Sequence, residues 1–194
     1  CLVPSSLAFT LAVIAQVGLL SALCPRLVPG RYPMMKSPVF WGWLFRSMLR
    51  RLLLLPGLKW LVMTSNVLRF FALRALGADV AFSASMSSDV DVLDPQLLRV
   101  SKGAMLGARS ILTGHYVEQG TLVLGAISVG EGALLAADVM CGPEVTIGAG
   151  ARIGARTSLS VGVVVGEDAR VAADVFLDMG AKVGKGVVRA KDTP

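Results

Sequence analysis

The stretch that decides the fold runs from Val129 to Val187 and reads VGEGALLAADVMCGPEVTIGAGARIGARTSLSVGVVVGEDARVAADVFLDMGAKVGKGV. A bulky apolar residue recurs at every sixth position, and the next residue is glycine or another small or turn-forming type. A second, generally smaller residue follows four positions after each bulky one, from Ala133 to Val187. A period sustained this long indicates a repeat architecture. The bulky positions are Val129, Leu135, Cys141, Ile147, Ile153, Leu159, Val165, Val171, Leu177 and Val183.

A period of six has a specific structural meaning. A period of two alone would predict strands, and a period of 3.6 would predict a helix. One bulky and one small inward residue per six predict short strands that meet at corners, with about 18 residues per turn and each turn buried against its neighbours. We expect the glycine-type residue to relieve the backbone at the bend, where positive φ is often needed. The prediction is a left-handed parallel β-helix, an exception to the right-handed crossover rule.

The same pattern begins upstream, at about residue 78, but with faults. The step from Leu112 to Val117 is five residues, so the period is one residue short, and His115 lies in this fault. Because a coil gains nothing structurally from losing a residue, the fault suggests a functional purpose. Elsewhere we see no long loop that could close over a substrate. The upstream positions in phase are Val80, Met86 and Val92, then Val100, Leu106 and Leu112, then Val117 and Val123.

The first 77 residues differ in composition from the rest. They carry nine Lys or Arg and no Asp or Glu, whereas residues 78–194 carry ten Lys or Arg and thirteen Asp or Glu. Overall, 54% of residues are hydrophobic and 16% are charged, against about 45–50% and 25% in ordinary soluble domains. We therefore predict a membrane-attached helical region, residues 1–77, and a β-helix domain, residues 78–194. The charge distribution argues against a nucleic-acid partner.

The N-terminal apolar run predicts a transmembrane helix over about residues 5–24. It is uncharged and long enough for a hydrocarbon layer of ~30 Å. Arg26, Arg31 and Lys36 follow it, which places the β-helix on the cytoplasmic side of the membrane. A cleaved signal peptide is an alternative, but its positive residues would precede the run. Lipidation of Cys1 is another alternative, against which the lack of a polar spacer argues.

A second apolar region, from Val39 to Ala72, is interrupted by arginines and split at Pro56-Gly57. Because neither half is a clean span, we expect interfacial or re-entrant helices over about residues 38–75, in contact with membrane lipid. A helical pair packed on the coil of a soluble protein is the competing interpretation. The region contains all three tryptophans of the chain, Trp41, Trp43 and Trp60.

The repeats resemble those of the hexapeptide-repeat acyltransferase superfamily, which includes serine, sugar and xenobiotic acetyltransferases. A narrower likeness is to the membrane-embedded C-terminal region of poly-lysine synthetase-like peptide synthetases. The superfamily resemblance implies a homotrimer with active sites between neighbouring prisms. It also implies an acyl-CoA co-substrate (acetyl-CoA first) or a carrier-bound donor, and a histidine general base. The narrower likeness rests on LVPGRYP (27–33), LRALGADV (73–80), DPQLLRVSKGAMLG (94–107) and GHYVEQGTLVLGAISVG (114–130).

His115 is the only histidine in the chain, so it alone can be the base that the resemblance implies. Imidazole suits the role because it titrates near neutral pH. Glu118 could orient the ring or bind an acceptor amine, and the amide of Gly125 could stabilise an oxyanion. The simpler interpretations are a surface histidine and a solvated carboxylate. Candidates for the coenzyme A phosphates, or simply a solvated end of the coil, are Lys182, Lys185 and Arg189.

No metal site is expected. A γ-type carbonic anhydrase shares the prism but needs three histidines on zinc, and the acidic residues are scattered along the repeats. The three cysteines show no pair or metal spacing, which suits a reducing compartment. Cys141 occupies an inward position of the repeat, so we predict a core residue and not a nucleophile.

These observations predict a membrane-associated acyltransferase. It would transfer an acyl group to a hydroxyl or amine of a membrane-proximal small-molecule or peptide acceptor, with His115 as the base. The alternative is a non-catalytic trimeric β-helix scaffold or an assembly subunit of a larger membrane complex. The acyl group, the acceptor and any membership of a larger synthetase are left open by the residues.

Overall fold

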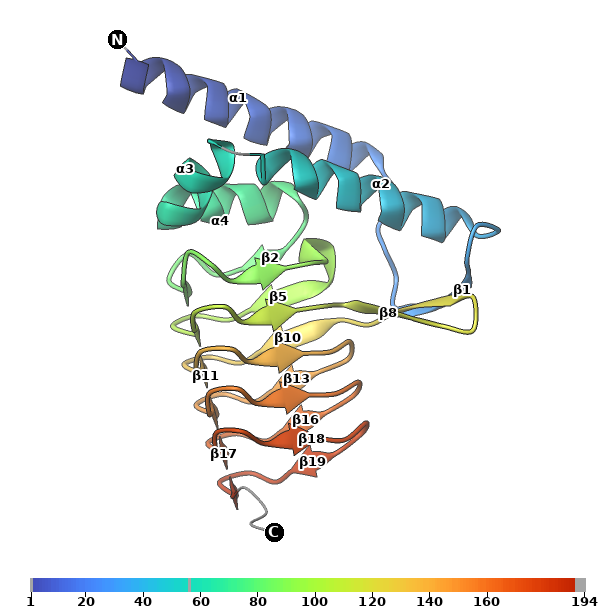
Figure 1. The fold of residues 1–194 in the computed structure, drawn as a ribbon, viewed down its shortest axis with the longest axis vertical. Coiled ribbons are helices and arrows are strands. Elements are labelled where there is room, and N and C mark those ends of the chain that lie inside the picture. Colours follow the sequence, from blue (N-terminus) through green and yellow to red (C-terminus); the bar gives the residue numbers. More distant parts are fainter. Residues whose placement is uncertain (1, 56, 191–194) are drawn as a thin grey trace.

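The computed structural model describes residues 2–55 and 57–190 and shows a triangular parallel β-helix capped by a layer of helices (Figure 1). Cys1, the site of the alternative lipidation, lies outside the described residues. Three parallel sheets form the faces of the prism. The first face contains β2 (Asp79–Val80), β5 (Leu98–Val100), β10 (Ile127–Val129), β13 (Thr146–Ile147), β16 (Val164–Val165) and β19 (Lys182–Val183). The second contains β3 (Ser85–Met86), β6 (Met105–Leu106), β11 (Leu134–Leu135), β14 (Arg152–Ile153), β17 (Arg170–Val171) and β20 (Val188–Arg189). The third contains β4 (Asp91–Val92), β7 (Ile111–Leu112), β12 (Met140–Cys141), β15 (Ser158–Leu159) and β18 (Phe176–Leu177).

The register confirms the predicted left-handed β-helix. Val129 pairs with Ile147, and Leu135 pairs with Ile153, so successive turns are aligned 18 residues apart. All ten bulky positions from Val129 to Val183 are buried in one continuous core. Cys141, at 0% exposure, is a core residue as predicted. Each turn therefore shields its apolar residues only through contact with the turns above and below it.

Glycine is needed after the bulky residues for a different reason from the one expected. Positive φ falls two residues later, for example at Gly132, Asp138 and Gly150, and not at Gly130 or Gly148. A Cβ at Gly130 would lie 2.5 Å from the backbone nitrogen of Ala149 in the next turn. These positions are small because successive turns approach closely there. The expected role of positive φ at them was wrong.

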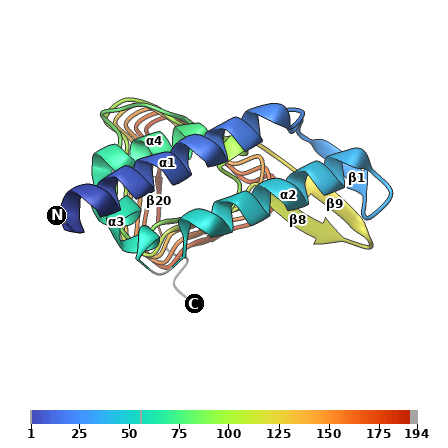
Figure 2. The ribbon, with the colours of Figure 1, turned by 90° about the horizontal axis from the view of Figure 1, so that it is seen from above.

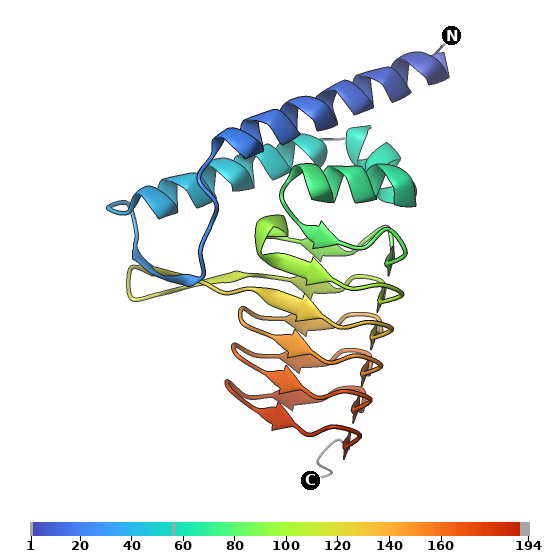
Figure 3. The ribbon, with the colours of Figure 1, turned by 180° about the vertical axis from the view of Figure 1, so that it is seen from behind.

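The fault around His115 is an inserted hairpin, so the assignment of Val117 and Val123 to the coil was wrong. After Leu112 the chain leaves the prism as β8 (His115–Glu118) and β9 (Thr121–Leu124), which pair antiparallel. The inward pattern resumes at Val129 in β10. The hairpin is also the long projecting segment that the sequence pattern had not shown. β1 (Gly30–Pro33) pairs with β9, making a three-stranded arm beside the prism (Figure 3).

Four helices cover the N-terminal end of the prism. They are α1 (Leu2–Leu23), α2 (Pro38–Leu53), α3 (Leu58–Thr64) and α4 (Asn66–Ala75). Viewed from above, α1 crosses over α4 while α2 runs beside it (Figure 2). By length and composition, Ser5–Leu23 is the one described segment that could cross a membrane, a test that core helices and signal sequences also pass.

Arginines tie this helical layer together and join it to the first turn. Arg46 is buried and donates to the carbonyls of Ser21, Cys24 and Pro25, which lie at and just beyond the C-terminal end of α1. Such carbonyls have no partner within their own helix. Arg50 of α2 pairs with Asp91 of β4 at 2.8 Å. The helices therefore form one unit with the start of the coil.

The corner between the second and third faces carries alternating charges along the prism. Arg109 donates two hydrogen bonds to Asp138 in the next turn, and Arg156 donates two to Asp174 in the turn that follows its own. The hydrogen bonds from Arg109 lower the pKa of Asp138. The sequence of charges along this corner, which we call the charge ladder, is Asp89, Arg109, Asp138, Arg156 and Asp174.

Candidate active site

The two departures from the six-residue period meet at one corner of the prism. Between Val92 and Val100 the step is eight residues, and the short 3-10 helix η1 (Pro95–Leu97) occupies the excess. The hairpin β8–β9 leaves from the same corner one turn later. Asp94 begins the first departure, and His115 follows Gly114 at the start of the second. Repetition of the coil therefore brings together two residues that are 21 positions apart.

The carboxylate of Asp94 is fully buried and accepts three hydrogen bonds. Its Oδ2 lies 2.6 Å from His115 Nδ1 and 2.9 Å from the donating amide of Gly114. Its Oδ1 accepts from the indole Nε1–H of Trp43, at 2.8 Å. A buried carboxylate needs such donors because its desolvation is otherwise costly. Asp94 thus holds the hairpin, α2 and the imidazole in one arrangement.

The other imidazole nitrogen is open. The side chain of His115 is 25% exposed, and among the described residues none makes a hydrogen bond to Nε2. The Trp43 ring lies against the imidazole with a centroid separation of 4.8 Å. When Asp94 accepts a hydrogen bond from Nδ1–H, the lone pair of Nε2 is available to a reactant. This is the geometry of a histidine base oriented by a carboxylate.

Comparisons with known proteins show which known fold the β-helix shares. A sequence profile for the hexapeptide repeat of succinyl-transferase matches residues 144–179. Among solved structures, a maltose O-acetyltransferase from Clostridium difficile 630 is similar with a TM-score of 0.51 and 14% identity, over 69% of this chain and 83% of that one. The chain therefore shares the hexapeptide-repeat β-helix fold of that enzyme. At that identity the match shows the shared fold.

Two further solved structures are similar to this chain, with lower TM-scores. A hexapeptide transferase family protein from Anaplasma phagocytophilum has 20% identity, coverage of 59% of this chain and 74% of that one, and a TM-score of 0.41. The acetyltransferase domain of PglB from Neisseria gonorrhoeae FA1090, in complex with acetyl coenzyme A, has 18% identity, coverage of 65% and 63%, and a TM-score of 0.30. No curated protein matches the chain, and the likeness to poly-lysine synthetase-like proteins gains no support here.

The structure does not bring Glu118 or the amide of Gly125 to the imidazole of His115. Side chains alternate along a strand, so Glu118 points to the opposite face of β8 from His115, where it pairs with Arg31 at 2.8 Å. The amide of Gly125 donates to the carbonyl of Gly114 at 2.8 Å, which closes the neck of the hairpin. Neither group is therefore placed to serve His115 in this arrangement.

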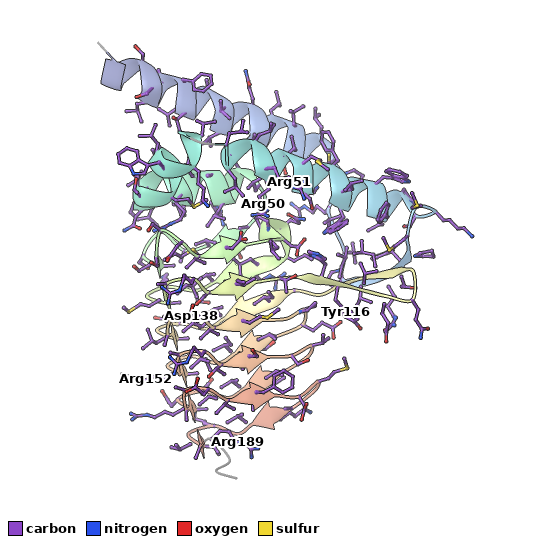
Figure 4. The ribbon with its side chains drawn as sticks, viewed as in Figure 1. Arg50, Arg51, Tyr116, Asp138, Arg152 and Arg189 are labelled. Atoms are coloured by element: carbon purple, nitrogen blue, oxygen red, sulfur yellow. The ribbon has the colours of Figure 1, made fainter. Side chains whose placement is uncertain are left out.

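The candidate donor-binding cations lie at the far end of the prism. Lys182 is in β19, Lys185 follows at the next corner and Arg189 is in β20, where Figure 4 labels it near the C-terminal end. β19 is four strands from β5 on the first face, or roughly 19 Å at the usual strand spacing. Lys185 is paired with Glu167 at 2.6 Å. A donor would have to extend along the prism to reach both ends.

Sequence reasoning missed two residues of this site. Asp94 was detectable in principle, because it opens the eight-residue step that shares a corner with His115. Trp43 carried no such signal, since 51 positions separate it from Asp94. Among the described residues, no group of three metal-ligating side chains is found. The chemistry available is that of a carboxylate–imidazole pair beside an indole ring.

Two hollows lie near the helices, and neither contains Asp94 or His115 in its wall. A small apolar cavity of about 30 Å³ lies between the helical layer and the first turn, with Leu53, Val62 and Met86 in its wall. An open groove of about 540 Å³ runs along the first face past Phe82 and Arg99. The side chain of His115 is 25% exposed.

Proposed function

We propose that this chain is a membrane-associated acyltransferase. It transfers an acyl group, acetyl in the first instance, from a coenzyme A or carrier thioester to a hydroxyl or amine of an acceptor near the membrane. The observation that carries the proposal is the 2.6 Å contact between Asp94 and His115 with Nε2 left open. The fold shared with a maltose O-acetyltransferase supports the reaction class. The helical layer beside the site supports an acceptor that is presented at a membrane.

In the proposed reaction, Nε2 of His115 removes the proton from the acceptor hydroxyl or amine as its oxygen or nitrogen attacks the thioester carbonyl. The tetrahedral intermediate collapses by breaking the carbon–sulfur bond. The departing thiolate is protonated by the imidazolium, so the neutral imidazole of His115 is regenerated. Asp94 stabilises the imidazolium and keeps the proton on Nδ1 between turnovers.

A homotrimer is part of the proposal, and the third face offers a surface for it. Its outward positions include three large apolar side chains that are exposed at 40–65%: Ile111, Met140 and Phe176. Ser158 lies between Met140 and Phe176 on this face, so the apolar side chains are grouped but not continuous. Exposed apolar side chains grouped on one face commonly mark an interface. This face adjoins the corner that carries Asp94 and His115. Trimerisation through it would place the pair in a cleft between prisms.

The test is a transfer assay on the full chain in detergent. Acetyl-CoA binding is measured by calorimetry, and coenzyme A release is followed with a panel of hydroxyl and amine acceptors. We expect His115→Gln to retain binding and to lose roughly 10²–10⁴-fold in transfer rate. Asp94→Asn should lose rate in the same direction, whereas Asp174→Asn, an exposed carboxylate of the charge ladder, serves as the matched control. Folding is checked by thermal unfolding for each variant.

A non-catalytic scaffold is the second candidate, and one observation favours it. The three hydrogen bonds to Asp94 connect the coil, the hairpin and α2, which is also what a structural joint requires. If Asp94→Asn lowers stability and neither acetyl-CoA nor a carrier-bound donor reacts with the folded trimer, the scaffold is correct. Retained transfer in His115→Gln would instead exclude the proposed base.

A further inference from the structure

We infer that the four helices form one platform that lies flat on an anionic lipid bilayer, and that α1 rests in the interface without crossing. The inference rests on the proposed membrane attachment and replaces the predicted span. In Figures 1 and 3, α1 is the outermost element and runs across the end of the prism, roughly perpendicular to the prism axis. A helix that crossed the bilayer in this arrangement would lay the prism along the membrane plane.

α1 is held to the platform by a narrow stripe. Its buried positions recur at helical spacing, Thr10, Ile14, Val17 and Ser21. Gly18 allows close contact with α4, since a Cβ there would lie 3.2 Å from the Cβ of Ala75. Between Ser5 and Leu23 the other positions of the helix include several exposed large apolar side chains, and none of them is charged. A helix that is apolar all round belongs in a protein core or in lipid, and one stripe alone is covered by protein.

α2 presents its own apolar stripe away from the prism. Trp43 and Arg50 point toward the coil, where they contact Asp94 and Asp91. At 100° per residue, the side opposite these two residues carries the large exposed side chains of the helix. They are Trp41, Phe45, Met48 and Leu52, exposed at 43–51%. The face of α2 that is turned away from the coil is therefore apolar along its length.

The charges of the platform complement anionic lipid. Residues 1–77 contain no carboxylate side chain, and Arg26, Lys36, Arg51 and Lys59 are exposed. Among the described residues none is hydrogen-bonded or ion-paired to these four cations. Trp60, exposed at 69%, follows Lys59. An apolar face with tryptophan and unpaired cations is typical of interfacial helices on anionic membranes. A second copy of this face would bring like charges together.

Vesicle binding tests the attachment. The full chain should co-sediment with phosphatidylglycerol-containing vesicles and much less with pure phosphatidylcholine. The double variant Arg51→Gln/Lys59→Gln should bind the anionic vesicles on the order of 10- to 30-fold more weakly, at ~1 kcal/mol per cation. Arg152→Gln/Arg170→Gln, which removes two exposed cations from the second face, is the matched control and should bind normally. Equal binding to both vesicle types would overturn the preference for anionic lipid and with it this inference. Binding to neither type would overturn the inference and the membrane attachment together.

The orientation of α1 is tested separately by cysteine labelling. Ser5→Cys lies near the start of α1 and Val28→Cys lies five residues after its last residue, Leu23. Each is made in a Cys1→Ser/Cys24→Ser background, and Cys141 is buried. In sealed vesicles, an impermeant maleimide added outside should label both ends, because both lie on the side of the prism. Labelling of one end only would show that α1 crosses, and it would overturn the flat platform while leaving attachment and acyl transfer intact.

Discussion

Trp43 and Asp94 are joined by a 2.8 Å hydrogen bond from the indole Nε1–H to the buried carboxylate, although one residue belongs to a cap helix and the other to a corner of the coil. The same tryptophan packs on the imidazole of His115. The helical layer therefore contributes directly to the surroundings of the proposed base. Removal of this layer would leave one oxygen of Asp94 without its donor.

Trp43→Phe tests this contribution. Phenylalanine keeps an aromatic ring at this position but lacks the Nε1–H that donates to Asp94. A buried acceptor left without its donor costs about 1–3 kcal/mol. We expect a lower free energy of unfolding and roughly tenfold lower kcat in the transfer assay with little change in KM. Trp41→Phe is the matched control, because its indole donates to the carbonyl of Met35 far from the site. Equal effects in the two variants would contradict a role for Trp43 at His115.

Gly154→Ala tests the close approach of successive turns. An added Cβ would lie 2.3 Å from the nitrogen of Ala173 and 2.4 Å from the carbonyl carbon of Ala172. Both are backbone atoms that cannot yield locally, so we expect a loss of about 1–3 kcal/mol in the free energy of unfolding. At Gly142 the nearest atoms are 3.3 Å away, and Gly142→Ala should cost clearly less. Chemical denaturation of both variants makes the comparison.

Arg109→Gln tests the charge ladder by its dependence on pH. The hydrogen bonds from Arg109 lower the pKa of Asp138, so the pair stabilises the fold above the ordinary aspartate pKa and loses that effect as the pH falls below it. The Tm difference between natural chain and variant should therefore be larger at pH 7 than near pH 2. Because both groups are exposed, the difference at pH 7 should be small and should shrink in high salt. A constant difference across pH would contradict the assignment.

Phe176→Asp tests the surface proposed for trimerisation. A carboxylate buried in this apolar contact would be desolvated without a partner. We therefore expect the trimer to dissociate in light scattering while the far-ultraviolet circular dichroism is unchanged. Val188→Asp replaces an equally exposed residue on the second face and should leave the oligomer intact. Dissociation by both substitutions, or by Val188→Asp alone, would place the contact elsewhere.

Cys141 should be chemically inert in the folded chain. Its complete burial raises the pKa of the thiol to about 12, so the thiolate is absent at pH 8 and access is closed. In a Cys1→Ser/Cys24→Ser background we expect no reaction with a disulfide reagent until denaturant is added. Because the unfolded thiol ionises near pH 9 and the folded one does not, alkaline pH should favour unfolding. Rapid labelling of the native protein would contradict the core assignment.

The periodic part of the fold could be predicted because each turn contacts only the next. The inward positions from Val129 to Val183 repeat one local environment, so the six-residue period in the sequence indicates which residues are buried.

The hairpin was assigned to the coil because its apolar residues follow the same period. Val117 and Val123 happen to match the six-residue phase, yet they belong to antiparallel strands that pair with each other and with β1. A pattern of apolar residues does not state which strands they pair with.

The sequence by itself determined the prism, its inward residues and His115 as the only imidazole. Only the tertiary structure decided the partners of that imidazole. Asp94 reaches His115 because successive turns stack two insertions at one corner, and Trp43 reaches both because Arg50 holds α2 against the first turn. These contacts join segments 21 to 72 positions apart. Local patterns encode burial within a repeat, whereas a site between repeats and cap depends on how separate segments pack.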